Sequence, residues 1–119
     1  MRRKPGAMLA IEESILTAGL DLRRRGEKEF HGFAVAKRMQ EIGEAAALTA
    51  HGTLYKALGR LAATGLLESR WEDADIALAE GRPRRRLYRI TALGEKTLAA
   101  IRANRGEAVA SRRDRLAPS

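Results

Sequence analysis

The sequence lacks cysteine altogether, and this absence excludes several kinds of protein chemistry. Without a thiol, the chain of 119 residues has no disulfide, no thiolate metal site and no thiol redox sensor. It also lacks any apolar run of about 18 residues, so we expect no membrane span. The apolar stretch near the N-terminus is interrupted at Glu12 and Glu13, which excludes a secretory hydrophobic segment. We therefore expect a globular, cytoplasmic domain.

Motifs for catalysis and for metal binding are also missing. Ser14, Ser69 and Ser111 stand outside any nucleophile elbow, and neither GxxxxGKS/T nor GxGxxG occurs. His31 and His51 are the only histidines and have no second set of metal ligands nearby in the sequence. The sequence therefore predicts no enzyme activity, no cofactor and no metal site.

Positive charge is what the chain has in excess. Lysine and arginine number 23 against 15 aspartate and glutamate residues, which gives a formal net charge of +8. Such an excess favours a polyanionic partner, although a surface adapted to solubility would also explain it. Arginines are concentrated beside Pro83, at Arg82, Arg84, Arg85, Arg86 and Arg89. An arginine-rich hairpin tip can follow phosphates or enter a minor groove, whereas a charge run of no function would be a solvated loop.

Apolar spacing predicts helices over residues 8–24, 31–42 and 49–64, with stop signals at Gly26, Gly43 and Gly65. Residues 44–48 fit either a frayed helix or a short edge strand. Residues 66–71 and 86–90 are typical of two strands joined by a long hairpin tip of polar and small residues. Thr91 then caps a last helix, which we expect to fray after Ser111.

This order of elements predicts a fold that is mainly α with a small β-hairpin. Three helices followed by a two-stranded ribbon are typical of a winged helix-turn-helix domain, here residues 8–91. Residues 92–111 would form a C-terminal dimerisation helix, and residues 1–7 and 112–119 flexible tails. The last helix has an apolar stripe with little to cover in one small domain, so we expect a homodimer. The predicted interface residues are Met8, Leu9, Ile15, Leu98, Ile101 and Ala108.

The helix predicted over residues 49–64 carries the expected DNA-reading face. Opposite its apolar stripe lie Gly52, Thr53, Lys56 and Arg60, and this face has no acidic residue. An ordinary exposed helix face is the alternative. The positive N-terminal end of the helix, with Thr49 and His51, would suit a phosphate. Tyr55 flanks the face and either reaches a phosphate or packs in the core.

Trp71 lies at the end of the first predicted strand. It is expected to fill the core or the dimer interface, where it would border a pocket for a small-molecule effector formed by the first and last helices.

Three sequence strings resemble the PadR family of bacterial transcriptional regulators. They are HGFAVAKR over residues 31–38, GTLYKAL over residues 52–58 and GRPRRRLYRIT over residues 81–91. The resemblance implies a homodimer that binds double-stranded DNA, commonly a repressor relieved by a small apolar or phenolic molecule. Phe33 stands where the family usually has Tyr, Ala34 replaces a frequent acid, and Ala50 and Lys56 occupy positions of frequent prolines.

Two other function classes remain open on the sequence. A winged-helix module that binds proteins would bind duplex DNA weakly, and mutation of Lys56 or Arg60 would not change its affinity for DNA. An enzyme would need a pocket of converging polar groups, which the sequence does not show.

Overall fold

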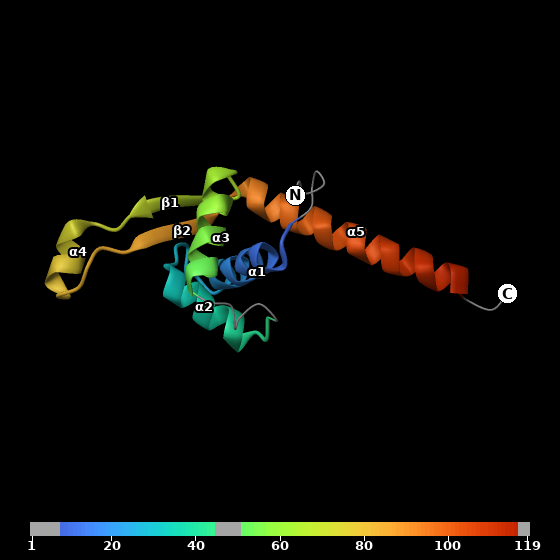
Figure 1. Cartoon of the computed structure of the whole chain (residues 1–119), viewed down its shortest axis with the longest axis horizontal. Coiled ribbons are helices and arrows are strands. Elements are labelled where there is room, and N and C mark those ends of the chain that lie inside the picture. The colour runs from blue at the N-terminus through green and yellow to red at the C-terminus, as the bar shows by residue number, and fades with distance from the viewer. Residues whose placement is uncertain (1–7, 45–50, 117–119) are drawn as a thin grey trace.

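Three helices begin the chain in this computed structural model, which describes the backbone of residues 8–44 and 51–116 and the side chains of residues 8–44 and 52–106. They are α1 (Ala10–Arg24), α2 (Gly32–Glu41) and α3 (His51–Ala63) (Figure 1). All three confirm the helices predicted from apolar spacing. Gly26 and Gly43 end the first two with φ angles of +95° and +75°, a left-handed backbone that glycine adopts without steric cost. Thr49 and residues 45–48 lie outside the described residues.

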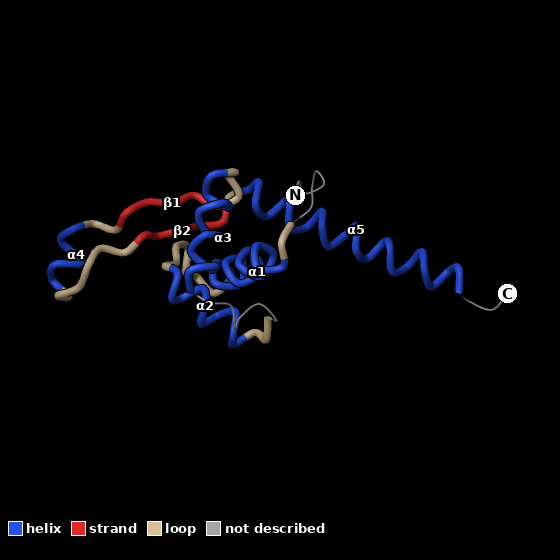
Figure 2. Tube along the Cα trace, in the orientation of Figure 1, coloured by secondary structure: helices blue, strands red, loops and turns tan. Residues whose placement is uncertain are grey.

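A β-hairpin follows α3. Strands β1 (Leu67–Trp71) and β2 (Arg86–Ile90) pair antiparallel, with Leu67 opposite Ile90 and Trp71 opposite Arg86, and so confirm the two predicted strands (Figure 2). The tip is not the irregular loop that the sequence predicted, because it contains the short helix α4 (Ala74–Ala79). Six residues are too few to show helical periodicity, although alanine and leucine are good helix formers. We call residues 67–90 the wing.

A third segment joins the hairpin from the loop between α1 and α2. Phe30 and Tyr88 exchange backbone hydrogen bonds of 2.9 and 2.8 Å, and their rings stack with centroids 6.2 Å apart. Both residues are buried. This bridge connects β2 to the segment between α1 and α2. β2 is therefore hydrogen-bonded along both of its edges, to β1 and to Phe30.

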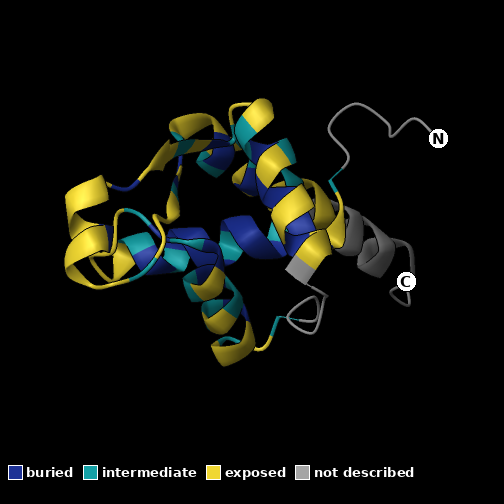
Figure 3. Cartoon of the chain, turned by 60° about the vertical axis from the view of Figure 1, so that its left-hand side comes forward, coloured by how far each residue is buried: buried dark blue, intermediate teal, exposed yellow. Residues whose placement is uncertain are grey.

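The core lies where α1, α2, α3, β2 and the start of the last helix meet (Figure 3). Its largest fully buried side chains come from the four long helices and from β1: Ile15, Leu16, Val35, Met39, Leu58, Leu61, Leu67 and Leu98. β2 adds the buried Tyr88 and Ile90. In the described part of the chain, no helix is long and apolar enough to cross a bilayer.

The last helix, α5, spans Ala92–Leu116 and extends well beyond the rest of the domain (Figure 1). Thr91 caps it as predicted, since its hydroxyl accepts a hydrogen bond from the Gly94 N–H at 3.0 Å. The expected fraying after Ser111 is not seen. Residues 112–116 contain no glycine or proline and are rich in arginine, a good helix former, so the helix continues.

α5 runs antiparallel along α1 within the same chain. Three polar pairs mark the contact, in which Glu95 meets Arg23 at 2.7 Å, Arg102 meets Thr17 at 2.9 Å and Arg105 meets Glu13 at 2.8 Å. Two predicted dimer-interface residues are consequently covered by their own chain, with Ile15 0% and Leu98 1% exposed. The prediction of a dimer contact through Ile15 and Leu98 is wrong, because α1 already covers the start of the α5 stripe.

Candidate nucleic-acid interface

A hollow of about 660 Å³ opens between the wing and the N-terminal parts of α2 and α3. We call it the wing hollow. Aromatic and basic side chains dominate its lining, which consists of His31, Gly32, Phe33, Tyr55, Trp71, Arg82, Pro83, Arg84, Arg85, Arg86 and Tyr88. The hollow therefore joins two of the segments that the sequence singled out for DNA contact, the arginine-rich part of the wing and the first turns of α3.

Three consecutive arginines supply the positive charge of this surface. Arg84, Arg85 and Arg86 are exposed, and none of their guanidinium groups contacts a carboxylate in the described part of the chain. Eight other arginines are paired with acids: Arg23, Arg25, Arg38, Arg60, Arg70, Arg82, Arg89 and Arg105. Because most of the acidic side chains are thus engaged, the positive charge of residues 84–86 stays available to an external anion.

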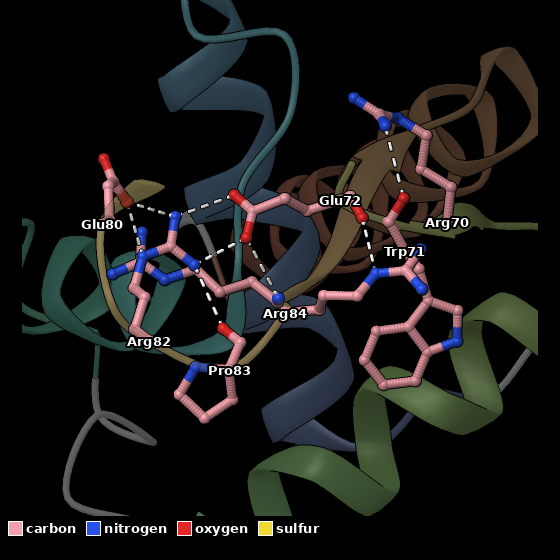
Figure 4. Close-up of polar contacts among 8 residues, drawn as sticks. Arg70, Trp71, Glu72, Glu80, Arg82, Pro83 and Arg84 are labelled. Atoms are coloured by element: carbon pink, nitrogen blue, oxygen red, sulfur yellow. Dashed lines mark hydrogen bonds and ion pairs between the residues drawn. The ribbon is translucent and has the colours of Figure 1, made fainter. Parts of the chain in front are cut away.

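Arg82 has a different role from its neighbours. Its guanidinium group donates four hydrogen bonds: to both carboxylate oxygens of Glu72 at 2.6 and 2.9 Å, to Glu80 at 2.6 Å and to the Pro83 carbonyl at 3.2 Å (Figure 4). A further ion-pair contact to Glu80 is 2.6 Å long. Two internal acids thus hold Arg82, in contrast to the free DNA contact that the sequence predicted. Its partners stand ten and two residues away in the sequence, and only folding of the α4 segment brings them together.

Glu72 connects the end of β1 to residues 82–85 of the wing. It is buried, and the bonded Arg82 guanidinium, assisted by the Arg85 backbone N–H at 3.2 Å, lowers the pKa of Glu72 to about 2. Its own backbone carbonyl accepts a bond of 2.9 Å from Arg84 Nε. This network holds the Arg84–Arg86 backbone against the end of β1, and no local pattern in the sequence predicts it.

The outward face of α3 is open. Gly52, Thr53 and Lys56 are exposed, and α3 contains no acidic residue. A Cβ atom added to Gly52 would meet nothing within 4 Å, so an external backbone can approach the helix closely there. The His51 side chain and Thr49 lie outside the described side chains.

Arg60 does not share this open face fully. Its Nε donates to Glu12 Oε2 at 2.9 Å, and Glu12 is 4% exposed and also accepts the Leu9 N–H at 3.0 Å. The ion pair anchors α3 to α1. Arg60 is thus held by an internal partner, whereas its position on the helix predicted a side chain free to contact DNA bases. The helical position gives the direction in which a side chain projects from α3, but it does not show that α1 lies there.

Tyr55 connects α3 to the beginning of α2. Its ring lies over Gly32 so closely that a Cβ atom on Gly32 would stand 2.6 Å from Tyr55 Cε1. Gly32 is therefore required to be glycine if the ring is to keep this place. Tyr55 is half exposed, so it packs against α2 and still faces the wing hollow.

His31 caps α2 at the edge of the hollow. Its Nδ1 accepts the Ala34 N–H at 3.3 Å, which requires the neutral ring. Partial burial, together with the positive charges of Arg85 and Arg82, lowers the pKa of His31 despite the opposing influence of Glu72 and Glu27. The hollow is accordingly an electropositive environment.

The lowered pKa of His31 predicts that part of the free energy of unfolding is lost at acidic pH. Because the folded state favours the neutral ring, this share is present above the ordinary pKa of 6.5 and is lost as pH falls below it. Urea unfolding of the wild type should lose more stability between pH 7.5 and 5.5 than that of His31→Asn, whose side-chain oxygen still caps the helix. An identical pH dependence in the two proteins would contradict the assignment.

Trp71 is located on the wing and not between α1 and α5. It is 53% exposed, and the guanidinium carbons of Arg86 and Arg84 lie 5.2 and 6.0 Å from its ring centroid. The predicted effector pocket between the first and last helices therefore cannot include it. Trp71 ends β1, at the end of the strand remote from α5, and this position follows from the hairpin register.

Comparison with known proteins agrees with this architecture. Residues 22–100 match the model of the family described as "Transcriptional regulator PadR-like family". Among curated proteins, none matches the sequence.

No group of three histidine, aspartate or glutamate residues suited to a metal ion occurs in the described part of the chain.

Several solved structures share the fold. A PadR family regulator from Eggerthella lenta has a TM-score of 0.63 and 23% identity, over 88% of this chain and 82% of its own. One from Clostridium difficile has a TM-score of 0.63 and 21% identity, over 90% and 97%. Bacillus subtilis PadR, solved in complex with operator DNA, has a TM-score of 0.58 and 18% identity, over 77% and 46%.

Proposed function

Because the chain belongs to the PadR-like family of transcriptional regulators, which are not enzymes, we propose that it is a homodimeric repressor that binds a specific duplex DNA sequence. The observation that carries the proposal is that the guanidinium groups of Arg84, Arg85 and Arg86 meet no carboxylate among the described residues and lie beside an α3 face free of acids. A dimer that covers its operator excludes other proteins from the same DNA, and for this reason we propose repression.

In the proposed complex the two basic elements have different tasks. α3 enters the major groove with Gly52, Thr53 and Lys56 facing the DNA, and the wing arginines follow the adjacent phosphates or the minor groove. The similar Bacillus subtilis structure contains operator DNA, which supports the use of this fold for duplex binding. Two-fold symmetry would place a second copy on the other half of a pseudo-palindromic site.

Lys56 is the residue expected to contribute to sequence preference. Operator fragments are first selected from genomic DNA with the wild-type protein, and Lys56→Ala is then titrated against the selected duplex and a scrambled one. Loss of a base contact should cost roughly 1–3 kcal/mol on the operator and much less on the scrambled duplex. Equal losses on both duplexes would make Lys56 a phosphate contact only. Failure of the wild type to prefer any fragment would refute the proposed function.

The dimer is proposed to form through α5 and the start of α1. Ile101 and Met8 are half buried and Leu9 is exposed, so all three keep apolar surface for a partner, whereas the Ala108 side chain is outside the described ones. Ile101→Glu should sediment as a monomer at micromolar concentration and bind the operator roughly tenfold or more weakly, since one half-site contact is lost. Lys96→Glu, an exposed change on the same helix, should remain dimeric. A wild-type monomer with full operator affinity would contradict this proposal.

A further inference from the structure

The single tryptophan of the chain lies exposed on the wing, although large aromatic side chains gain most from burial. Trp71 ends β1 opposite Arg86 and is 53% exposed. A duplex offers no free ring for it to stack on, because the faces of paired bases stay stacked on one another. The position of Trp71 therefore calls for a role other than filling the core or stacking on bases.

The face of the hairpin that carries Trp71 continues the core. Side chains alternate between the two faces of a strand, so Leu67 and Trp71 share one face with their cross-strand partners Ile90 and Arg86. Burial falls along this row, from the buried pair of Leu67 and Ile90 to the exposed pair of Trp71 and Arg86. The exposed pair lines the wing hollow together with Tyr55 of α3. Trp71 thus lies where the core gives way to the surface proposed to meet DNA.

Two arginines lie over the Trp71 ring. The guanidinium carbons of Arg86 and Arg84 are 5.2 and 6.0 Å from its centroid, within the limit of about 6 Å for a cation–π contact. Each arginine also donates one hydrogen bond of 2.9 Å to the hairpin, Arg86 to Ser69 Oγ and Arg84 to the Glu72 carbonyl oxygen (Figure 4). Each guanidinium group is therefore held by two contacts, the ring and a hydrogen bond.

These contacts leave the charge of both groups available. Neither guanidinium group meets a carboxylate among the described residues, and most of its donors remain for a phosphate. Arg85, between them, has neither a ring contact nor a side-chain hydrogen bond in the described part of the chain. Arginine is long and flexible, and its ordering on binding costs entropy. Two of the three wing arginines are thus ordered in the free protein and the third is not.

From these observations we infer that Trp71 is a positioning residue for DNA binding, whose ring orders the guanidinium groups of Arg84 and Arg86 before a duplex arrives. The phosphates then bind cations that have already lost part of their freedom, which strengthens the contact. Trp71 acts through these two arginines, and neither through Arg85 nor through a contact of its own with DNA. The gain in affinity rests on the proposed function, whereas the ordering of the side chains does not.

Ordering is tested on the full chain without DNA. The Nε–H groups of the three arginines give signals in the ¹H–¹⁵N spectrum, and ¹⁵N relaxation reports their mobility. In the wild type, Arg84 and Arg86 should be less mobile than Arg85 and should be shifted by the ring current of Trp71. In Trp71→Leu both signals should approach the mobility of Arg85. Signals that are the same in wild type and Trp71→Leu would overturn the inference.

A mutant cycle tests the route to DNA. On a duplex of arbitrary sequence, Trp71→Leu should weaken binding roughly fivefold or more, and by less than about twofold when Arg84 and Arg86 are already alanine. The matched background replaces Arg85 and Arg89 with alanine and removes the same charge, and there Trp71→Leu should keep its full effect. Equal effects in the two backgrounds would overturn the inference, since Trp71 would then act by a contact of its own or through the fold.

The conservative variant separates the ring from the volume of the side chain. Trp71→Phe keeps an aromatic face for the cations, whereas Trp71→Leu keeps an apolar side chain without one. Trp71→Phe should bind the duplex within about threefold of the wild type, and circular dichroism should show both variants folded. If Trp71→Phe bound as weakly as Trp71→Leu, the cation–π contact would not be what Trp71 contributes, and the inference would fail.

The two proposals fail separately. Phosphates are the same in every duplex, so the mutant cycle needs no operator. A wild type that binds DNA but prefers no fragment would refute the proposed function, and the cycle would still decide the role of Trp71. An operator preference that stays intact while Trp71→Leu binds as tightly as the wild type would overturn this inference alone. A wild type that binds no duplex would overturn both.

Discussion

Replacing Arg84, Arg85 and Arg86 together with alanine is expected to weaken binding to every duplex, operator or scrambled, by roughly a hundredfold or more. The number follows from three lost phosphate contacts at about 1 kcal/mol each. The slope of log K against log salt concentration should flatten by about 0.9 for each contact that was made. Titrations at several salt concentrations measure both quantities. The variant loses the bond from Arg84 Nε to the Glu72 carbonyl, but the Glu72–Arg82 pair remains, so the wing should stay folded, and circular dichroism checks this.

The control removes the same charge elsewhere. Arg24, Arg70 and Arg89 are exposed arginines outside the wing hollow, and their joint replacement by alanine lowers the net charge equally. It should reduce affinity far less, because only the long-range attraction is weakened and salt screens it within about 10 Å at 0.1 M. Equal losses in the two triple variants would mean that DNA responds to total charge and has no preferred contact with Arg84, Arg85 and Arg86.

Gly94→Ala should have the largest effect on stability of any glycine substitution in α5. A Cβ atom at this position would stand 2.2 Å from the Leu66 carbonyl oxygen and 3.0 Å from Ile90 Cγ1. The helix would have to move away from the turn between α3 and β1, where Thr91 also bonds Gly65 and Leu66. Overpacking of this kind costs about 1–3 kcal/mol, and contact with rigid backbone places the expected loss at the upper end. Urea unfolding gives the value.

Gly106→Ala provides the opposite case in the same helix. A Cβ atom there meets nothing within 4 Å, so alanine should add up to about 1 kcal/mol of helix propensity. Gly94→Ala would receive the same propensity, and any difference between the two variants therefore reports the steric contact. If both substitutions stabilised the protein, α5 would not be seated on Leu66 as described.

Local signals in the sequence were sufficient for most of the fold. Apolar spacing located α1, α2 and α3, and alternating short runs located β1 and β2. α4 was missed because six residues contain less than two helical turns, and its buried contact, Ala77, looks like any small loop residue. The bridge between Phe30 and Tyr88 was missed because a single pair of backbone hydrogen bonds has no sequence pattern.

The candidate site was predictable in its location and not in its internal pairing. The charge run identified the wing, and the wheel identified the open face of α3. Which cations remain available depends on acids that are distant in the sequence, and both errors have this origin. Glu12 holds Arg60 from 48 residues away, and Glu72 holds Arg82 from ten. Trp71 was misplaced because the direction of a strand relative to α5 is a property of the assembled fold.

Two adjacent glutamates of α1 have a consequence for the spacing of DNA sites. Neighbouring residues project about 100° apart around a helix, so Glu12 holds Arg60 of α3 while Glu13 holds Arg105 of α5. α3 and α5 are thus both attached to the same turn of α1, which fixes their positions relative to each other. In a dimer joined through α5, the two recognition helices would keep a set separation and phase. One base pair inserted between half-sites moves the second by about 3.4 Å and turns it by about 35°, which a rigid assembly cannot follow. Such a protein would distinguish operators by their length as well as by their bases.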